Sequence, residues 1–245
     1  MSIPRFYCPT ILAPGALVSL PANAAVHASK SLRLKAGDIA ILFNGDGHDY
    51  TCEFVSIQKN NVTAKIRSVS RNNTESPLRI TLAQAISSGD RMDFTLQKAV
   101  ELGVSAIQPI ASQRSVVKLS GERMEKRREH WQNVVISACE QSGRALVPQV
   151  AAPLSLPAWL ATQPAFTMKL TMSPLANETL QGLPSPTGEV FLLIGSEGGL
   201  TEDEISMASN SGFRPVKLGR RILRTETAPL AAIAAMQMLW GDFRE

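Results

Sequence analysis

Two glycine-centred loops hold the residues of this sequence most suited to chemistry. The first, Gly195-Ser196-Glu197-Gly198-Gly199, follows the apolar stretch Val190–Ile194, which we predict to be a buried strand. Its three glycines allow the backbone to approach a ligand closely. Glu197 lies inside the loop and no Lys-Ser/Thr pair follows it, so the loop is unlike a phosphate-binding P-loop. An acidic loop at the carboxyl end of a strand suits hydroxyls, amines or a cationic cofactor.

The second glycine-centred loop, Gly219–Thr227, also follows a predicted strand. A third loop, Thr171-Met172-Ser173-Pro174, follows another predicted strand. Open α/β sheets bind ligands at the carboxyl ends of their strands. Gly and Pro also turn a chain where there is no ligand. That alternative explains one loop more easily than three that carry Glu197, Arg224 and Glu226, so we predict a ligand site.

Other chemistries lack the residues they need. The three histidines fit no metal spacing, no GxSxG nucleophile motif occurs, and no GxGxxG follows the first strand of the α/β part. Cys8, Cys52 and Cys139 are widely separated and form neither a disulfide framework nor a CxxC metal pattern. We expect free buried thiols, and we expect no metal.

The charge of the chain is unevenly distributed. Its 245 residues, 44% hydrophobic and 19% charged, provide for one large domain or two ordinary ones. The net charge of +4 lies entirely in residues 1–72, and residues 73–245 are neutral. A basic module beside a neutral one indicates a polyanion-holding domain attached to a domain with another task. An accessory domain with a chance excess of charge is the alternative.

The hydropathy of the chain predicts a cytoplasmic protein. The amino terminus lacks the basic start and long apolar core of a signal peptide. No apolar run reaches the roughly 18 residues of a membrane-spanning helix. We therefore expect no membrane partner.

Residues 1–72 have the pattern of a small β domain. We predict strands over Ala40–Phe43, Tyr50–Ile57 and Val62–Val69, with one helix over Ala24–Leu34. Hairpins of this length favour a compact β-barrel. The polar segment Arg71–Pro77 has the composition of a linker, and we divide the chain into domains at 1–72 and 73–245.

Strands and helices alternate after the linker, which indicates a parallel sheet covered on both faces. The predicted strands are Leu78–Ile86, Val104–Ile110, Phe166–Met172, Val190–Ile194 and Pro215–Leu218. The predicted helices are Arg91–Leu102, Glu122–Ser142, Leu156–Ala161, one from the N-cap Thr201 to near Gly212, and Ala228–Trp240. The last is apolar nearly all round, broken only by Gln237, so we expect it to be buried on all sides. Either the chain itself or a second subunit must cover its outer side.

The two loops resemble the paired signature loops of the SPOUT methyltransferases. The segments are Gly195–Leu200 and Leu218–Ala228. More narrowly, the chain resembles the bacterial 16S ribosomal RNA uridine-N3 methyltransferases, the RsmE family. The supporting segments, in order along the chain, are Pro4–Tyr7, His27–Asp38, Lys98–Val104, Arg114-Ser115 and Glu140–Arg144. Ser196 departs from the family, which usually has proline there, and a serine softens the loop.

The resemblance implies an α/β fold with a SPOUT-type parallel sheet, a carboxyl-terminal trefoil knot and a small amino-terminal PUA-like β-barrel. It implies a homodimer and S-adenosylmethionine bound in a bent form by the knot loops. The cofactor-binding residues it implies are Thr171, Ser173, Leu175, Ile194, Gly195, Ser196, Glu197, Gly198, Gly199, Leu218, Gly219, Ile222, Leu223, Thr225, Thr227 and Ala228. Knots are nearly absent from proteins at large, and this one accounts for the apolar final helix.

The reaction implied by the resemblance is methylation of N3 of a specific uridine in 16S rRNA, with this rRNA in the small ribosomal subunit as the partner. Because the N3 imide of uracil must lose a proton, the site needs a base or a cation that stabilises the anion. We assign Arg224 to the anion and Glu197 or Glu226 to the proton. An ion pair that merely holds the loop is an equal alternative for Arg224.

The implied RNA-binding residues are Arg5, Lys30, Arg33 and Lys35 in the amino-terminal module and Arg114 and Arg144 at the mouth of the catalytic domain. Such contacts give affinity and salt dependence rather than sequence choice. Two other functions stay open from the sequence. One is a SPOUT methyltransferase acting at another rRNA or tRNA position, such as a ribose 2′-hydroxyl; the other is a non-catalytic RNA-binding factor for ribosome assembly.

Overall fold

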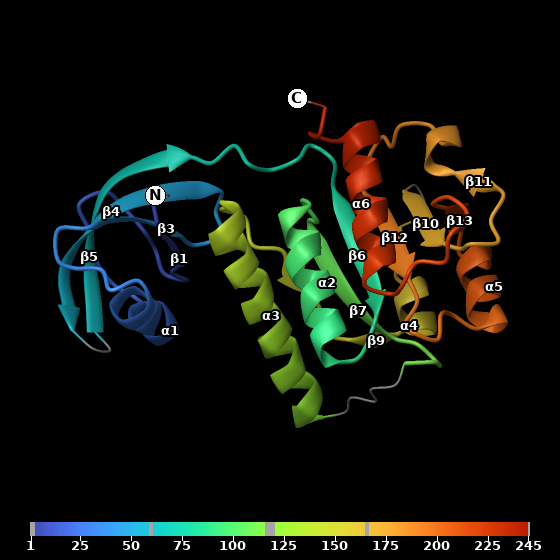
Figure 1. Cartoon of the computed structure of the whole chain (residues 1–245), viewed down its shortest axis with the longest axis horizontal. Helices are drawn as coiled ribbons and strands as arrows, with labels where there is room; N and C mark the ends of the chain where they lie inside the picture. Colours follow the sequence, from blue (N-terminus) through green and yellow to red (C-terminus); the bar gives the residue numbers. More distant parts are fainter. Residues whose placement is uncertain (1–2, 59–60, 116–120, 165–166, 245) are drawn as a thin grey trace. The chain divides into compact units, whose positions relative to one another are not determined.

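A computed structural model describes residues 3–58, 61–115, 121–164 and 167–244 of the chain (Figure 1). The chain divides into two compact units. The first comprises residues 1–75 and 139–147, and the second comprises residues 76–138 and 148–245. Residues 139–147, which were predicted to belong to the catalytic domain, cluster instead with the amino-terminal unit.

The first unit contains a five-stranded mixed sheet. Its strands are β1 (Arg5–Tyr7), β2 (Leu17–Ser19), β3 (Ile39–Phe43), β4 (His48–Gln58) and β5 (Asn61–Arg71). Their order is β1-β3-β4-β5-β2, with β1 parallel to β3 and the other pairs antiparallel. Strand pairing within the described residues shows a mixed sheet with β1 and β2 at its edges, and it does not show the closed barrel that we predicted.

The predicted helix over Ala24–Leu34 is interrupted. The α-helix α1 spans Ala22–Val26, and a π-helical turn follows over His27–Ser31. Arg33 then has φ 53°, a left-handed conformation that is uncommon outside glycine. The turn therefore ends in an exposed and strained segment rather than in a regular helix.

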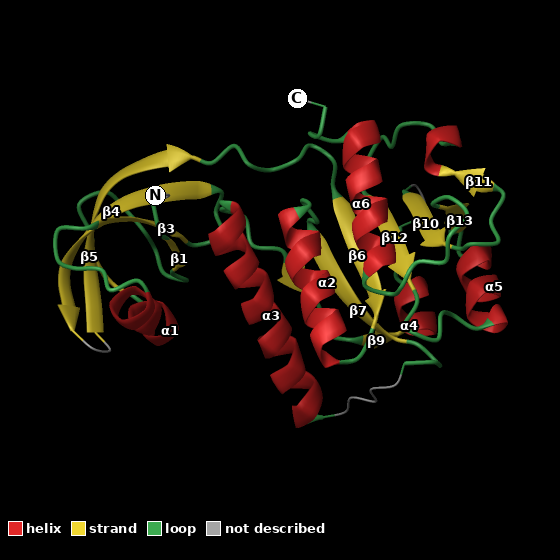
Figure 2. Ribbon diagram, in the orientation of Figure 1, coloured by secondary structure: helices red, strands yellow, loops and turns green. Residues whose placement is uncertain are grey.

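The second unit is built on a parallel sheet, which confirms the α/β prediction (Figure 2). Its strands are β6 (Ile80–Ala85), β7 (Ala106–Ala111), β8 (Gln149–Val150), β9 (Leu154–Ser155), β10 (Met168–Met172), β11 (Glu178–Thr179), β12 (Val190–Ile194) and β13 (Arg214–Lys217). The order is β11-β13-β10-β12-β6-β7-β8, and β9 pairs with the far end of β7. The predicted start of one strand, Phe166, lies outside the described residues.

Helices cover both faces of this sheet. They are α2 (Gly89–Glu101), α3 (Glu122–Ser142), α4 (Leu156–Leu160), α5 (Glu202–Asn210) and α6 (Thr227–Trp240), with a short 3₁₀ turn at Leu180–Gly182. Helices α2 and α6 pack side by side on one face (Figure 1). On the other face, Trp159 of α4 packs against Phe191 and Phe213. The predicted capping box of α5 is present, since Thr201 and Glu204 exchange hydrogen bonds of 3.2 and 2.9 Å.

Within a single chain helix α6 is fully buried on one face only, so of the two covers that we considered for its outer side the chain itself does not supply a complete one. Its buried residues are Pro229, Ala232, Ile233, Met236 and Gln237. Its outer face is half-buried or exposed, and Met238 is 55% exposed. The described residues of a single chain cover this apolar face only in part.

Gln237, the polar residue within the apolar part of α6, is buried and has hydrogen-bond partners. Its side-chain nitrogen donates to the carbonyl of Leu102 (2.9 Å), and its oxygen accepts from the hydroxyl of Ser76 (2.7 Å). Gly103 has φ 87°, and a Cβ there would meet the Gln237 amide at 2.7 Å. A glycine is therefore required where the end of α2 passes the buried amide.

Candidate active site

The glycine loop after β12 is a tight turn that only glycine can form. A Cβ on Gly195 would meet the backbone of Gly199 at 2.8 to 2.9 Å. The amide of Gly199 donates to the carbonyl of Ser196 at 2.9 Å, and Gly199 has φ 70°. Ser196 donates its hydroxyl to the carbonyl of Arg114 at 3.0 Å. This bond restrains the loop that serine was expected to soften.

Arg114 lies along this loop. Its guanidinium donates to the carbonyls of Gly198 (2.8 Å) and Leu200 (3.4 Å). A Cβ on Gly198 would meet the Arg114 side chain at 3.1 Å, so glycine permits this close contact. The side chain stays exposed, which leaves its other donors facing solvent.

The second signature loop is tied to the first by a hydroxyl. Thr225 donates to the carbonyl of Gly195 at 2.7 Å, and the amide of Gln84 donates to the Thr225 oxygen at 3.1 Å. Gln84 is fully buried in β6, directly beneath both loops. Gln84 was not predicted as a site residue, although a glutamine between Ala83 and Ala85 in a predicted strand was a usable signal.

Glu197 is bound to the start of helix α2. Its Oε1 accepts from the amide of Ser88 (2.9 Å), from the Ser88 hydroxyl (2.8 Å) and from the guanidinium of Arg91 (3.1 Å). Burial opposes ionisation of this carboxyl, but these hydrogen bonds outweigh it and lower the pKa of Glu197 to about 2. A carboxylate so satisfied is a poor proton acceptor at neutral pH, and its position assigns it to holding the loop.

Arg91 and Glu226 extend this cluster. The Nε of Arg91 lies 4.0 Å from Oε2 of Glu226. The Nη1 of Arg224 lies 4.0 Å from the other oxygen of this carboxylate, Oε1. Glu226 is 17% exposed, while the Arg224 side chain is 79% exposed. Arg91 was not predicted, because an arginine in the first turn of a helix has no local signature.

Three cavities surround the two loops. One of about 90 Å³ is lined by Met172–Pro174, Leu218-Gly219, Arg221–Leu223 and Ala228. A second of about 230 Å³ shares the wall Met172–Pro174 and is lined also by Thr171, Leu175, Gly195, Gly198–Leu200, Ile205 and Arg114. The third, about 180 Å³, is lined by Arg91, Glu197, Arg224, Thr225 and Glu226.

Most of the predicted cofactor residues therefore line one of these cavities. Ile194, Ser196 and Thr227 line none of the three: Ile194 is buried at the end of β12, Ser196 is buried against Arg114, and Thr227 begins α6. All three predicted catalytic residues line the third cavity.

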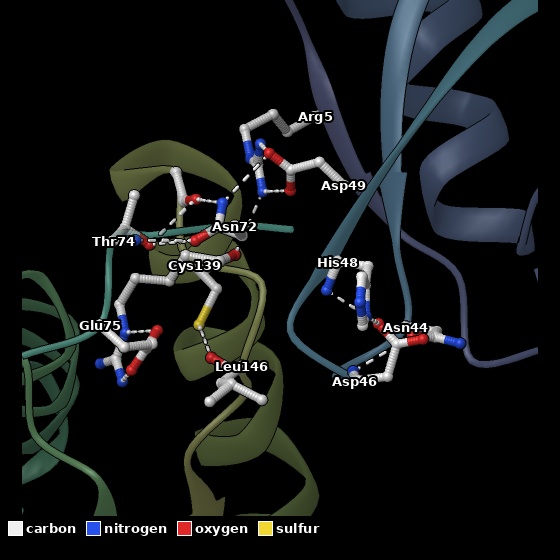
Figure 3. Close-up of polar contacts among 12 residues, drawn as sticks. Arg5, Asn44, Asp46, His48, Asp49, Asn72, Thr74, Glu75, Cys139 and Leu146 are labelled. Atoms are coloured by element: carbon white, nitrogen blue, oxygen red, sulfur yellow. Dashed lines mark hydrogen bonds and ion pairs between the residues drawn. The ribbon is translucent and has the colours of Figure 1, made fainter. Parts of the chain in front are cut away.

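Arg5 and Arg144 are engaged inside the first unit. Arg5 forms two hydrogen bonds to Asp49 (3.0 and 2.8 Å; Figure 3). Its guanidinium also lies over the Phe43 ring, 5.3 Å from the ring centroid. Arg144 is buried and donates to both oxygens of Glu75 at 2.9 and 2.6 Å. These internal pairs correct the expectation that both are surface contacts for phosphate. Lys30, Arg33 and Lys35 remain exposed.

The predicted free thiols are confirmed, since Cys8, Cys52 and Cys139 are buried and unbridged. Burial raises the pKa of both Cys52 and Cys139 to about 12, so neither is a nucleophile at neutral pH. Cys139 donates weakly to the carbonyl of Leu146 (Figure 3). The described residues contain no group of three or more His, Cys, Asp or Glu that could hold a metal ion, and none of their helices is long and apolar enough to cross a membrane.

Comparison with known proteins identifies the class. Residues 74–237 match the RNA methyltransferase domain family, and residues 20–67 match the RNA methyltransferase PUA domain family. One similar structure is the crystal structure of a ribosomal RNA small subunit methyltransferase E from Neisseria gonorrhoeae bound to S-adenosyl methionine. Its sequence is 48% identical to this chain, and the match has a TM-score of 0.93 and covers 99% of this chain and 100% of that one. A putative methyltransferase from Legionella pneumophila, in complex with the cofactor SAM, is 39% identical with TM-score 0.96 over 99% and 100%.

Curated relatives narrow the class to a family. The ribosomal RNA small subunit methyltransferase E of Buchnera aphidicola subsp. Schizaphis graminum is 38% identical, covering 98% of both chains. That of Bacillus subtilis is 34% identical, covering 88% of this chain and 89% of its own. The chain belongs to the ribosomal RNA small subunit methyltransferase E family, as its motifs predicted.

Because Glu197 is held as an anion by hydrogen bonds, we expect Glu197→Gln to lower the stability of the protein at neutral pH and to lower it less at acidic pH. Its pKa is lower in the folded protein than its ordinary 4.5, so its contribution is present above about pH 4.5 and is lost as pH falls toward 2. We expect the variant to lose about 2 kcal/mol of unfolding free energy at pH 7. Urea denaturation at a series of pH values measures this, with Glu125→Gln, from an exposed ion pair on α3, as control. A deficit that does not shrink on acidification would contradict the assignment.

Proposed function

We propose that the protein transfers the methyl group of S-adenosylmethionine to N3 of a specific uridine in the 16S rRNA of the small ribosomal subunit, in the cytoplasm. The observation that carries this proposal is the pair of glycine loops joined by the Thr225–Gly195 hydrogen bond, with one cavity lined by Gly195 and another by Thr225. The relatives that share this fold and are bound to the cofactor support it.

The residues around the first two cavities fit the cofactor. Ile222 and Leu175 line them and are 85% and 90% exposed, although they are large and apolar. Such side chains suit the faces of an adenine ring. Backbone groups of Leu218 and the glycine loop would bind the adenine and ribose. S-adenosylmethionine supplies an electrophilic methyl group on a positively charged sulfur.

The third cavity supplies the residues that act on the uracil. The acceptor nitrogen must be held in line with the methyl group, and such positioning supplies much of the rate. Glu226 takes the imide proton, because Glu197 is already bound to Ser88 and Arg91. Arg224, whose side chain is exposed, stabilises the negative charge that spreads over O2 and O4.

We also propose the carboxyl-terminal trefoil knot of the SPOUT fold. It is supported by the strand order, in which β13 lies beside β10 and away from β12, and by α6, which returns to pack on β12 and α2. A crystal structure that traces the segment 218–240 outside every loop of the chain would contradict it.

A homodimer would cover α6. The half-buried or exposed side chains on its outer face include Leu230, Ala231, Ala234, Met238 and Leu239. An apolar stripe of this kind is what homodimer interfaces bury. We propose a second copy of the chain as the cover.

The reaction is tested by mass spectrometry of 16S rRNA incubated with enzyme and S-adenosylmethionine. We expect N3-methyluridine at one position, and 2′-O-methylation or no product would overturn the proposal. With Glu226→Gln the single-turnover rate should fall about a hundredfold or more, because the base is removed. Arg224→Ala should also lower the rate at saturating RNA and cofactor. An unchanged rate in Arg224→Ala would leave this residue as a loop contact.

The salt dependence of RNA binding tests whether the exposed basic residues of the first unit contact RNA phosphates. Replacing Lys30, Arg33 and Lys35 together by glutamine should weaken binding and reduce the slope of log affinity against log salt by about 0.7 for each phosphate that is no longer neutralised. Filter binding across a salt series measures the slope. The control neutralises the exposed ion pair Arg67–Glu53, as Arg67→Gln with Glu53→Gln. A full slope in the triple variant would remove these residues from the RNA site.

Subunit association tests the α6 interface. Met238→Glu places a charge on the proposed interface, so dimers should dissociate at least about tenfold more readily. Analytical ultracentrifugation measures the dissociation constant. Ile11→Glu, at a 93% exposed site in the first unit, is the control. A monomeric wild-type protein would contradict the dimer.

A further inference from the structure

We infer that Arg91, Glu226 and Arg224 together read the edge of the target uracil, with Arg91 as the second of two guanidinium groups. This inference rests on the proposed function and specifies how its site selects the base. The three side chains line one cavity of about 180 Å³ together with Glu197 and Thr225. They come from helix α2 and from the loop before α6.

Glu226 stands between the two arginines, at ion-pair rather than hydrogen-bond distance from each. Arg91 is 4.0 Å from one carboxylate oxygen, and Arg224 is 4.0 Å from the other. The oxygen on the Arg91 side, Oε2, is buried and has no hydrogen-bond partner among the described residues. Leaving a buried acceptor unpaired costs about 1 to 3 kcal/mol. Glu226 lines the cavity, and a substrate donor that reached Oε2 by a small movement of this carboxylate would remove the cost.

Arg91 is held in place by a separate contact. One of its terminal nitrogens donates to Glu197 at 3.1 Å. Glu197 also accepts twice from Ser88, so it does not depend on Arg91 alone. A guanidinium has five N–H donors in a fixed plane, which leaves Arg91 several for a ligand in the cavity. The Glu197 contact therefore orients Arg91 without saturating it.

The order of these groups matches uracil. The pairing edge of uracil presents O2, N3–H and O4, which are acceptor, donor and acceptor. The two guanidiniums with the carboxylate between them present donor, acceptor and donor. Cytosine presents an unprotonated N3 at the centre, which would face the carboxylate lone pairs. A site built on such pairs rejects a mismatched partner strongly, because its buried groups are then left unpaired.

The same arrangement serves the transfer step. The N3 proton passes to Glu226, and the uracil anion then shifts so that the N3 lone pair turns from this carboxylate to the methyl carbon and forms the new bond. The electron pair of the broken carbon–sulfur bond stays on sulfur. Charge that develops on O2 and O4 meets one guanidinium each, so stabilisation by Arg91 grows as the proton leaves. Around Glu226 the charged groups are Arg91 from α2, Glu197 from the glycine loop and Arg224 from its own loop.

The test compares two RNAs in single-turnover reactions at saturating RNA and cofactor. One 16S transcript contains uridine, and the other contains 5-fluorouridine, whose electron-withdrawing fluorine makes N3–H more acidic. Arg91→Met should lower the rate on the uridine RNA at least about tenfold. It should recover much of that loss on the fluorinated RNA, since a more acidic imide depends less on the cation. Arg91→Lys should fall between Arg91→Met and the wild type.

Lys98→Met is the matched control, because Lys98 lies on the same helix, pairs with Glu101 and does not line the cavity. Its rates should equal those of the wild type on both RNAs. An unchanged rate in Arg91→Met, or an equal loss on both RNAs, would overturn the inference while the proposed function stands. A wild-type protein that forms no N3-methyluridine on either RNA would overturn the proposed function, and this inference with it.

Discussion

The hydrogen bond from Thr225 to the carbonyl of Gly195 joins the two loops that make the site. It reaches across 30 residues of sequence and brings a turn after β12 against a turn that follows β13. The buried amide of Gln84 supports it from below. Both loops contain glycine and few apolar contacts, so neither has much stability of its own. Their relative position, and therefore the shape of all three cavities, depends on this polar join.

Two carboxylates near this join have opposite environments. Glu197 accepts three hydrogen bonds on one oxygen and is a stable anion far below neutral pH. Glu226 has charged neighbours at 4.0 Å but keeps a buried oxygen without a partner among the described residues. A carboxylate oxygen whose lone pairs are occupied serves structure, whereas a buried oxygen without a partner is available to a donor on the substrate. The division of roles follows from hydrogen bonding rather than from residue type.

The sequence was sufficient for the parts of the protein that have local signatures. Val190–Ile194, the capping box at Thr201 and Glu204, and the charged helix Glu122–Ser142 are present as predicted. Contacts between distant residues were not accessible in this way. Arg91 meets Glu197 across 106 positions, and nothing around Arg91 in the sequence indicates this. Charge alone was a similarly poor guide to the candidate RNA contacts. Arg5 and Arg144 pair with carboxylates that lie 44 and 69 positions away in the sequence. Only the fold shows that these two charges are paired internally.

The final helix shows why polar residues matter in an apolar element. A helix of Ala, Leu, Ile and Met has nearly the same hydrophobic surface at every rotation about its axis, so burial alone fixes its rotation poorly. Gln237 has partners only when it faces Leu102 and Ser76, and an unpaired buried amide would cost about 1 to 3 kcal/mol. Thr225 fixes the loop at the other end. Polar contacts thus set the rotation of α6, and with it the apolar face that it turns outward.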